Sequence, residues 1–184
     1  MKKTKWTIDP THSQVQFKVK HLMITTVTGS FNEFESTVET SSDDFADAQI
    51  LFTAKTASVN TGNEQRDGHL KSDDFFNAEK YPELKFNSTR LTKKDDENLE
   101  LEGVLTIRDI TKKVKLAVEF GGVMTDPWGN VKAGFTVTGK ISRKEFGLSW
   151  NAVTEAGGVV VSDDVKIHTE VQYVKVAAPE TVEA

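Results

Sequence analysis

The sequence contains no cysteine. This absence excludes a disulfide framework, a zinc site built on thiolates and catalysis by a thiol nucleophile. It also means that the redox compartment cannot be read from the sequence.

Long apolar runs are missing as well. No stretch approaches the roughly 18 apolar residues that a membrane-spanning helix needs. The first ten residues, MKKTKWTIDP, hold early lysines but no apolar core of a signal peptide. We therefore expect a soluble, cytoplasmic protein without a membrane span. A periplasmic protein whose signal had been removed would give the same reading.

A strong positive charge is also lacking. Lys and Arg total 23 against 28 Asp and Glu, for a net charge of -5, and the basic residues are scattered along the chain. Nucleic acids and anionic membranes both need a positive patch, so this pattern argues against either surface. A partner nucleic acid is not expected.

Aromatic residues are unevenly distributed, with 11 Phe but only 2 Tyr and 3 Trp. Phenylalanine brings a large apolar surface without a polar group that needs a partner. This composition suits either a dry core or a cavity lined for a hydrocarbon, and composition alone favours the ordinary core. With 184 residues, the chain is long enough to bury such a core in one domain.

The most informative stretch is residues 131–151. Its first half alternates, with Ala133, Phe135, Val137, Gly139 and Ile141 on one face and polar residues on the other. Successive side chains of a strand point to opposite faces, so the pattern predicts a strand of about 36 Å with one apolar side. After a polar break at residues 142–145, a second apolar set follows: Phe146, Leu148 and Trp150.

The same alternation recurs along most of the chain. It predicts strands near residues 6–9, 15–20, 23–28, 30–39, 48–59, 84–91, 99–107, 114–120 and 163–175, with a bulge between Phe31 and Phe34 and a turn at residues 109–112. In the last strand Val165, Ile167, Thr169, Val171 and Tyr173 share a face. Residues 177–184 are small and acidic, and we expect them to be a disordered tail after a single domain at residues 1–176.

One segment breaks the strand rhythm. Thr61 followed by Glu64 is a capping-box pattern, which predicts a helix through about Leu70 and a second helical turn at residues 72–78. The second turn carries Phe75 and Phe76, which could plug one end of a barrel. The sequence therefore predicts an all-β protein: an antiparallel barrel of about eight strands with a short helical insertion near residues 61–78. At that strand number the interior is either filled by side chains or holds one small ligand.

Candidate catalytic and metal-binding groups do not form a convincing pattern. The four histidines, His12, His21, His69 and His168, lack metal-ligand spacing. Asp9, His12 and Ser13 are the residue types of a hydrolase triad, but they are neighbours in a turn without a nucleophile elbow, and capping explains them better. We predict no catalytic residue, no metal and no cofactor.

Arginine is scarce, and Arg143 stands at the break between the two apolar sets of residues 131–151. Its planar guanidinium could hold a ligand head group or pair with a carboxylate, and the structural role is favoured.

Several segments together carry a resemblance to a known family. They are WTIDPTHSQVQFKVKHL (6–22), HLKSDDFFNAEKYPELKF (69–86), GVLTIRDITKKVKL (103–116), GFTVTGKISRKEFGLSWN (134–151) and DDVKIHTEVQYVK (163–175). In this order they resemble the YceI-like family of lipocalin-like polyisoprenoid-binding proteins over nearly the whole chain. One departure is Asp109, where the family usually has glycine in a turn.

The resemblance implies an extended eight-stranded lipocalin-like barrel that holds a long isoprenoid chain in an elongated apolar pocket. It also implies a periplasmic or cytoplasmic location and, in many members, a homodimer. The expected ligand is a polyprenyl phosphate or an isoprenoid quinone, bound for carriage, storage or sequestration.

By strand parity we expect the cavity lining to consist of inward-facing apolar residues, with Phe76 at one end and Arg143 as the polar candidate. The predicted lining is Phe17, Val19, Phe34, Phe52, Phe76, Phe86, Leu105, Ile107, Phe135, Arg143, Phe146, Leu148 and Trp150.

Two alternatives stay open. The first is an enzyme acting on a lipid or quinone inside the same barrel, with Arg143, His12 and Glu145 as first candidates. The second is an interaction or stress-related protein whose barrel is simply filled.

Overall fold

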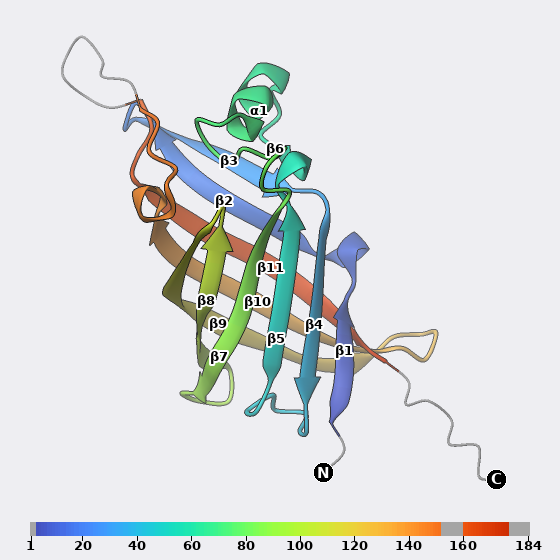
Figure 1. Ribbon diagram of the computed structural model, residues 1–184. Coiled ribbons are helices and arrows are strands. Elements are labelled where there is room, and N and C mark those ends of the chain that lie inside the picture. Colours follow the sequence, from blue (N-terminus) through green and yellow to red (C-terminus); the bar gives the residue numbers. More distant parts are fainter. Residues whose placement is uncertain (1–2, 152–159, 177–184) are drawn as a thin grey trace.

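The computed structural model describes residues 3–151 and 160–176. In these residues long antiparallel strands curve around a central interior, and one short helix lies across one end (Figure 1). The strands are β1 (Thr4–Ile8), β2 (Gln14–His21), β3 (Thr25–Phe31), β4 (Phe34–Thr40), β5 (Gln49–Lys55), β6 (Val59–Asn60), β7 (Glu83–Lys93), β8 (Asn98–Ile107), β9 (Ile110–Thr125), β10 (Val131–Ser142) and β11 (Asp164–Lys175). The helix is α1 (Glu64–Lys71), and 3₁₀ turns occur at Pro10–His12, Thr56–Ser58 and Arg143–Phe146.

The sheet closes because β1 pairs with both β4 and β11, with Trp6 opposite Lys175. The ring therefore runs β1-β4-β5-β7-β8-β9-β10-β11 and back to β1. At the other end of the barrel β2 takes the place of β1 beside β11, and β3 takes the place of β4 beside β2. In the described residues this is a closed antiparallel barrel of eight strand positions with a short helix, which confirms the predicted fold class.

Two strand positions of the ring are interrupted. The 3₁₀ turn at Pro10–His12 separates β1 from β2, since proline has no N–H for the ladder. Residues 32–33 separate β3 from β4, where the sequence predicts a bulge. The chain breaks there because the end of β3 pairs with β6, whereas β4 pairs with β1 and β5.

The hairpin between β8 and β9 is tighter than predicted. Ile107 pairs directly with Ile110, so the turn consists of Arg108 and Asp109. The left-handed backbone conformation falls on Arg108, at φ 56°, and not on Asp109. Aspartate at the family's glycine position therefore does not sit in the left-handed region.

The helix begins two residues later than predicted. The N-cap is Asn63, whose side chain accepts a hydrogen bond from the Arg66 backbone N–H. Asn is as good a cap as Thr, and it directly precedes Glu64. The predicted cap, Thr61, instead donates to Asp67 and accepts from the Arg66 guanidinium. Residues 72–78 form hydrogen-bonded turns and not a further helix.

The barrel is packed shut at the end far from α1. Trp6 and Phe45 are 0% and 1% exposed there. Phe45 comes from the β4–β5 loop, and its ring centre lies 5.2 Å from that of Trp6, 5.4 Å from Phe120 and 5.0 Å from Phe135. In the described residues this aromatic floor fills the end of the barrel opposite α1.

Candidate ligand cavity

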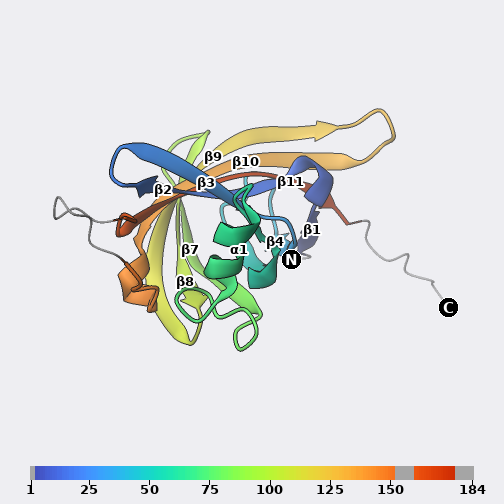
Figure 2. The same ribbon diagram turned by 90° about the horizontal axis from the view of Figure 1, so that it is seen from above.

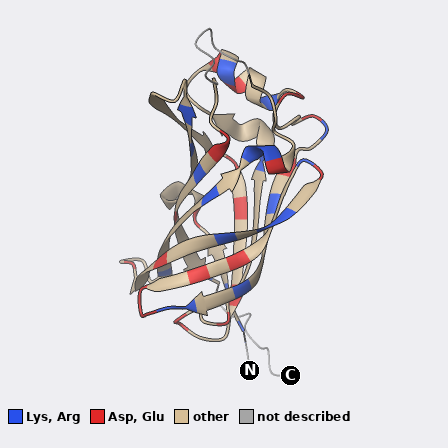
Figure 3. Cartoon of the chain, turned by 90° about the vertical axis from the view of Figure 1, so that its left-hand side faces the viewer, with Lys and Arg blue, Asp and Glu red and all other residues tan. Residues whose placement is uncertain are grey.

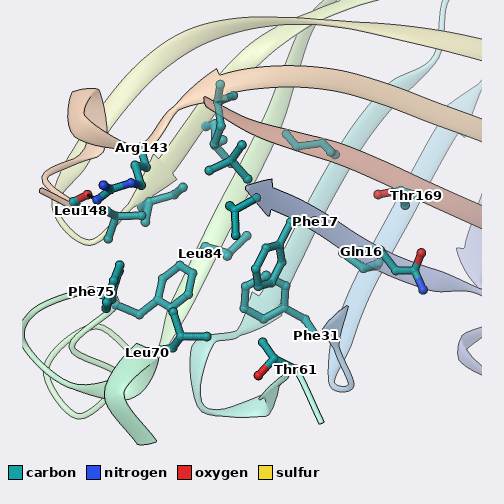
Figure 4. A pocket seen from close by; sticks show the side chains of 18 of the residues that line it. Gln16, Phe17, Phe31, Thr61, Leu70, Phe75, Leu84, Arg143, Leu148 and Thr169 are labelled. Atoms are coloured by element: carbon teal, nitrogen blue, oxygen red, sulfur yellow. Dashed lines mark hydrogen bonds between the residues drawn. The ribbon is translucent and has the colours of Figure 1, made fainter. Parts of the chain in front are cut away.

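A cavity of about 380 Å³ occupies the barrel between the aromatic floor and α1. Its walls come from β2, β3, β5, β7, β8, β9, β10 and β11. Leu70 and Phe75 (Figure 4), together with Phe76, cover it from the helical segment. This volume falls in the range of small-molecule sites. The barrel is therefore not solid with side chains.

One face of β11 follows the cavity from end to end. Val165, Ile167, Thr169, Val171 and Tyr173 all line it, which are the five residues whose alternation the sequence shows. Eight residue steps at about 3.3 Å give a length of about 26 Å. The cavity is thus elongated along β11, a shape that suits a chain more than a compact ring system.

Ten of the predicted lining residues lie on the cavity wall. They are Phe17, Val19, Phe52, Phe76, Phe86, Leu105, Ile107, Arg143, Leu148 and Trp150. Their contact with a ligand stays a prediction.

The other three predicted residues lie elsewhere. Phe135 packs into the aromatic floor against Phe45 and Phe120, beside a register shift between β9 and β10. Phe146 is only 1% exposed and belongs to the 3₁₀ turn at Arg143–Phe146, where the two-residue period of a strand no longer applies. Phe34 stacks against the ring of Phe52, with ring centres 6.4 Å apart, and is not on the wall.

Strand parity also overlooks part of the wall. Leu84 precedes Phe86 by two residues on β7, and Val137 and Ile141 alternate on β10, so the pattern contained the signal for them. Leu70 and Phe75 come from the helical segment, and only the three-dimensional fold brings them to the cavity.

The helical segment covers part of the α1 end of the cavity through aromatic contacts. The Phe76 ring lies 5.6 Å from Phe31, and the Phe75 ring lies 5.6 Å from Trp150. His69 packs edge-on against Trp150 at 4.6 Å, and its Nε2 lies 2.8 Å from an Asp74 carboxylate oxygen. The predicted role of this segment as an end-plug agrees with these contacts.

Arg143 is buried at the cavity wall, where its guanidinium ties two chain segments together through hydrogen bonds to backbone carbonyls; we call this arrangement the clip (Figure 4). Its Nε donates to the Ser162 carbonyl at 2.9 Å, Nη1 donates to the carbonyls of Leu148 and Trp150 at 2.5 and 2.8 Å, and Nη2 donates to the Val161 carbonyl at 3.3 Å. Burial lowers the pKa of the guanidinium from its ordinary value, and the Asp163 carboxylate, 3.7 Å away, opposes that shift. The donors are occupied by backbone, which favours the structural role over recognition of a head group.

Four ionisable side chains of the wall lie at the α1 end of the cavity, which we call its mouth. Lys20 and His21 come from the end of β2, while Arg66 and His69 come from α1. Near the floor, the Ser36 hydroxyl donates to the Leu51 carbonyl and lies 2.8 Å from the Tyr173 hydroxyl. Because the single Ser36 proton is committed to Leu51, Tyr173 donates to Ser36. Between these two ends the wall is mainly apolar, with Gln16 and Thr169 as its polar residues.

The candidate catalytic groups do not converge. His12 hydrogen-bonds Asp9 at 2.9 Å, but Ser13 Oγ accepts from the Gln172 N–H on β11 and does not face His12 as a nucleophile would. Neither His12 nor Glu145 lies on the cavity wall. Among the described residues no group of three His, Asp or Glu side chains could hold a metal ion.

None of the helices in the described part of the chain has the length and apolar composition that a membrane span requires.

Comparisons with known proteins agree with this architecture. Residues 6–173 match the YceI-like domain. A curated UPF0312 protein of Staphylococcus aureus is 39% identical over 171 residues, covering 92% of this chain and 97% of that protein.

Solved structures show the same fold. The Campylobacter jejuni YceI protein is 35% identical with a TM-score of 0.74, over 86% of this chain and 90% of that one. Burkholderia cenocepacia BcnA has a TM-score of 0.78 at 21% identity, over 90% and 98% of the two chains. A polyisoprenoid-binding domain from Saccharophagus degradans has a TM-score of 0.68 at 16% identity, over 93% and 98%. The match across almost the whole chain, together with the barrel and its cavity, shows that this protein belongs to the YceI-like family.

Proposed function

We propose that the protein binds a long-chain isoprenoid lipid, of the polyprenyl phosphate or isoprenoid quinone class, inside its barrel. The observation that carries this proposal is the long apolar cavity between the aromatic floor and α1. The polyisoprenoid-binding domain from Saccharophagus degradans, which shares the fold, supports the choice of ligand class.

Enclosure alone supplies the driving force. Each methylene removed from water stabilises the complex by about 0.8 kcal/mol, so a long tail needs no charged contact in the barrel. A polar head group would stay at the mouth, where Lys20, His21, Arg66 and His69 lie. Binding without turnover fits carriage, storage or sequestration of the lipid. A homodimer and the cytoplasmic or periplasmic location stay predictions.

The test is to extract freshly purified protein with organic solvent and to identify the extract by mass spectrometry, with native mass spectrometry of the intact complex in parallel. The expected result is one isoprenoid lipid per chain. A protein that carries no lipid, and takes up none when incubated with polyprenyl phosphates or quinones, would overturn the proposal.

A matched pair of variants on β10 separates the interior from the outer surface. Val137 lines the cavity, whereas its neighbour Thr138 is exposed. Val137→Trp should fill the cavity and remove the bound lipid, and Thr138→Trp should retain it. Equal lipid content in both variants would show that the ligand does not occupy this cavity.

A further inference from the structure

The hairpin between β2 and β3 ends in three consecutive apolar residues that face solvent. Leu22, Met23 and Ile24 are 40%, 56% and 77% exposed. Leu22 and Met23 have φ angles of 53° and 60°, a left-handed conformation that bulky residues rarely adopt. The fold thus holds these side chains outside the core at some cost in backbone strain. We call residues 22–24 the rim tip.

The rim tip continues directly from the cavity wall. Val19, Lys20 and His21 on β2 and Val27 on β3 all line the cavity. The Leu22 N–H donates to the Val160 carbonyl at 2.9 Å, which anchors the tip to the mouth. An object that contacts the rim tip therefore lies next to the opening of the cavity.

The β2–β3 hairpin that carries the rim tip differs in charge from the whole chain. Residues 14–31 contain Lys18 and Lys20 but no Asp or Glu, although the protein has a net charge of -5. Across the sheet Lys18 is opposite Lys166 on β11. Two carboxylates at the start of β11 and just before it each lie near a lysine: Asp163 is 3.4 Å from Lys144 Nζ, and Asp164 is 3.7 Å from Lys140 Nζ. Basic and acidic residues are spread over the barrel surface as a whole (Figure 3), so the overall composition hides this local excess.

We propose that the rim tip docks the mouth of the barrel onto an anionic lipid bilayer. Leu22, Met23 and Ile24 would enter the interface between head groups and acyl chains, and Lys18 and Lys20 would contact anionic head groups. Apolar side chains combined with nearby basic residues are the two features that bind a protein to a membrane surface. Docking there would let a lipid pass between bilayer and cavity without crossing water; this consequence, but not the docking itself, rests on the proposed function.

The opposite end of the molecule provides a natural control. The β9–β10 hairpin also exposes apolar side chains, with Met124 78% and Trp128 84% exposed. It extends away from the barrel on the side opposite the β2–β3 hairpin (Figure 2). Its loop carries Asp126, and it lies at the closed end of the barrel. Both hairpins therefore expose large apolar side chains. They differ in charge, and only the β2–β3 hairpin lies next to the mouth.

The first experiment measures flotation of the 184-residue chain with vesicles of phosphatidylcholine alone, or of phosphatidylcholine and phosphatidylglycerol in equal parts. Neither vesicle contains an isoprenoid, so docking is measured apart from ligand binding. We expect binding to the anionic vesicles that weakens with added salt. The variant L22S/M23S/I24S should lose at least about tenfold in affinity. K18Q/K20Q should lose about tenfold or more on anionic vesicles only. M124S/W128S should bind like the unmodified protein.

A second measurement detects insertion directly and does not depend on a loss of binding. Because the chain has no cysteine, Ile24→Cys and Met124→Cys each give one site for an environment-sensitive fluorophore. With anionic vesicles the probe at position 24 should shift to the blue, and the probe at position 124 should not. No vesicle binding by the unmodified protein, or equal shifts at both positions, would overturn the proposal. So would a serine variant of the rim tip that changes only the oligomeric state, since the tip would then join two copies of the chain.

Discussion

The ring of Phe17 lies directly against Gly29, its partner across β2 and β3: a Cβ atom added to Gly29 would be 2.3 Å from Phe17 Cζ. Phe17 also lines the cavity, so glycine at position 29 sets how far this ring extends into it. In Gly29→Ala the ring must move, and the open side is the cavity. We expect the affinity for lipid to fall while the free energy of unfolding drops by about 1 kcal/mol, the low end for an overpacked core.

Gly103→Ala gives the comparison. A Cβ atom there would lie 2.4 Å from Phe86 Cζ and also 2.5 Å from the Asn87 backbone oxygen, which cannot turn aside. We expect this variant to lose about 2–3 kcal/mol of stability. Urea unfolding and a lipid-binding titration of both variants test the difference. A Gly29→Ala protein with unchanged lipid affinity would show that Phe17 does not limit the cavity.

The floor of the barrel should depend on Phe45. Its ring is almost fully buried and contacts Trp6, Phe120 and Phe135. Phe45→Ala should lower the free energy of unfolding by about 3–5 kcal/mol, because it removes a large buried ring and leaves a void. Phe34→Ala, at a half-buried ring beside Phe52, should cost less. Thermal or urea unfolding measures both, and equal losses would contradict the assignment of Phe45 as the floor.

Stability at high pH should report on Tyr173. Burial raises the pKa of its phenol to about 12 from the ordinary value of 10.0, and the hydrogen bond with Ser36 partly offsets this shift. The raised pKa belongs to the folded state, so the contribution is complete below pH 10 and is lost as the pH rises toward 12. Two pKa units correspond to about 3 kcal/mol.

Tyr173→Phe removes this titration and leaves the Ser36 hydroxyl bonded to the Leu51 carbonyl. The difference in free energy of unfolding between the two proteins, measured from pH 9 to 12, should therefore shift by about 2 kcal/mol in favour of Tyr173→Phe, because at pH 12 the folded phenol is only half ionised. A difference that stays constant with pH would show that the phenol is not kept neutral by the fold.

The sequence predicts the strands well because the alternation of apolar and polar residues depends only on which face of each strand is buried. The face of β11 from Val165 to Tyr173 is the clearest case. Alternation fails where the backbone leaves the extended conformation, and Phe146 is misplaced because Arg143–Phe146 is a 3₁₀ turn. Phe45 could not be assigned, since its position depends on how the β4–β5 loop folds over the floor.

Strand alternation by itself could not predict whether the barrel is hollow, and only the family resemblance implied a pocket. An inward-facing phenylalanine reads the same in a filled barrel and on a cavity wall. The distinction depends on how far apart opposite strands lie and on close contacts such as that between Phe17 and Gly29.

Arg143 gives a prediction that separates its two proposed roles. As a clip it holds the carbonyls of Leu148, Trp150, Val161 and Ser162, and Arg143→Met would leave these groups without their donor. We expect a loss of about 3–5 kcal/mol in the free energy of unfolding, because one side of a buried charged network is removed. Arg143→Lys should also be destabilising, since an ammonium cannot reproduce the planar guanidinium geometry.

The control is Arg90→Met on the exposed side of β7, which should change the stability by less than about 0.5 kcal/mol. Amide hydrogen exchange at Leu148 and Val161 should accelerate in the Arg143 variants before global unfolding, because the clip ties these residues to one another. If Arg143 instead holds a ligand head group, Arg143→Lys would keep its stability and its amide protection and lose only affinity for anionic lipids. That outcome would contradict the structural role, since it would show that the hydrogen bonds from Arg143 to the backbone carbonyls do not stabilise the fold.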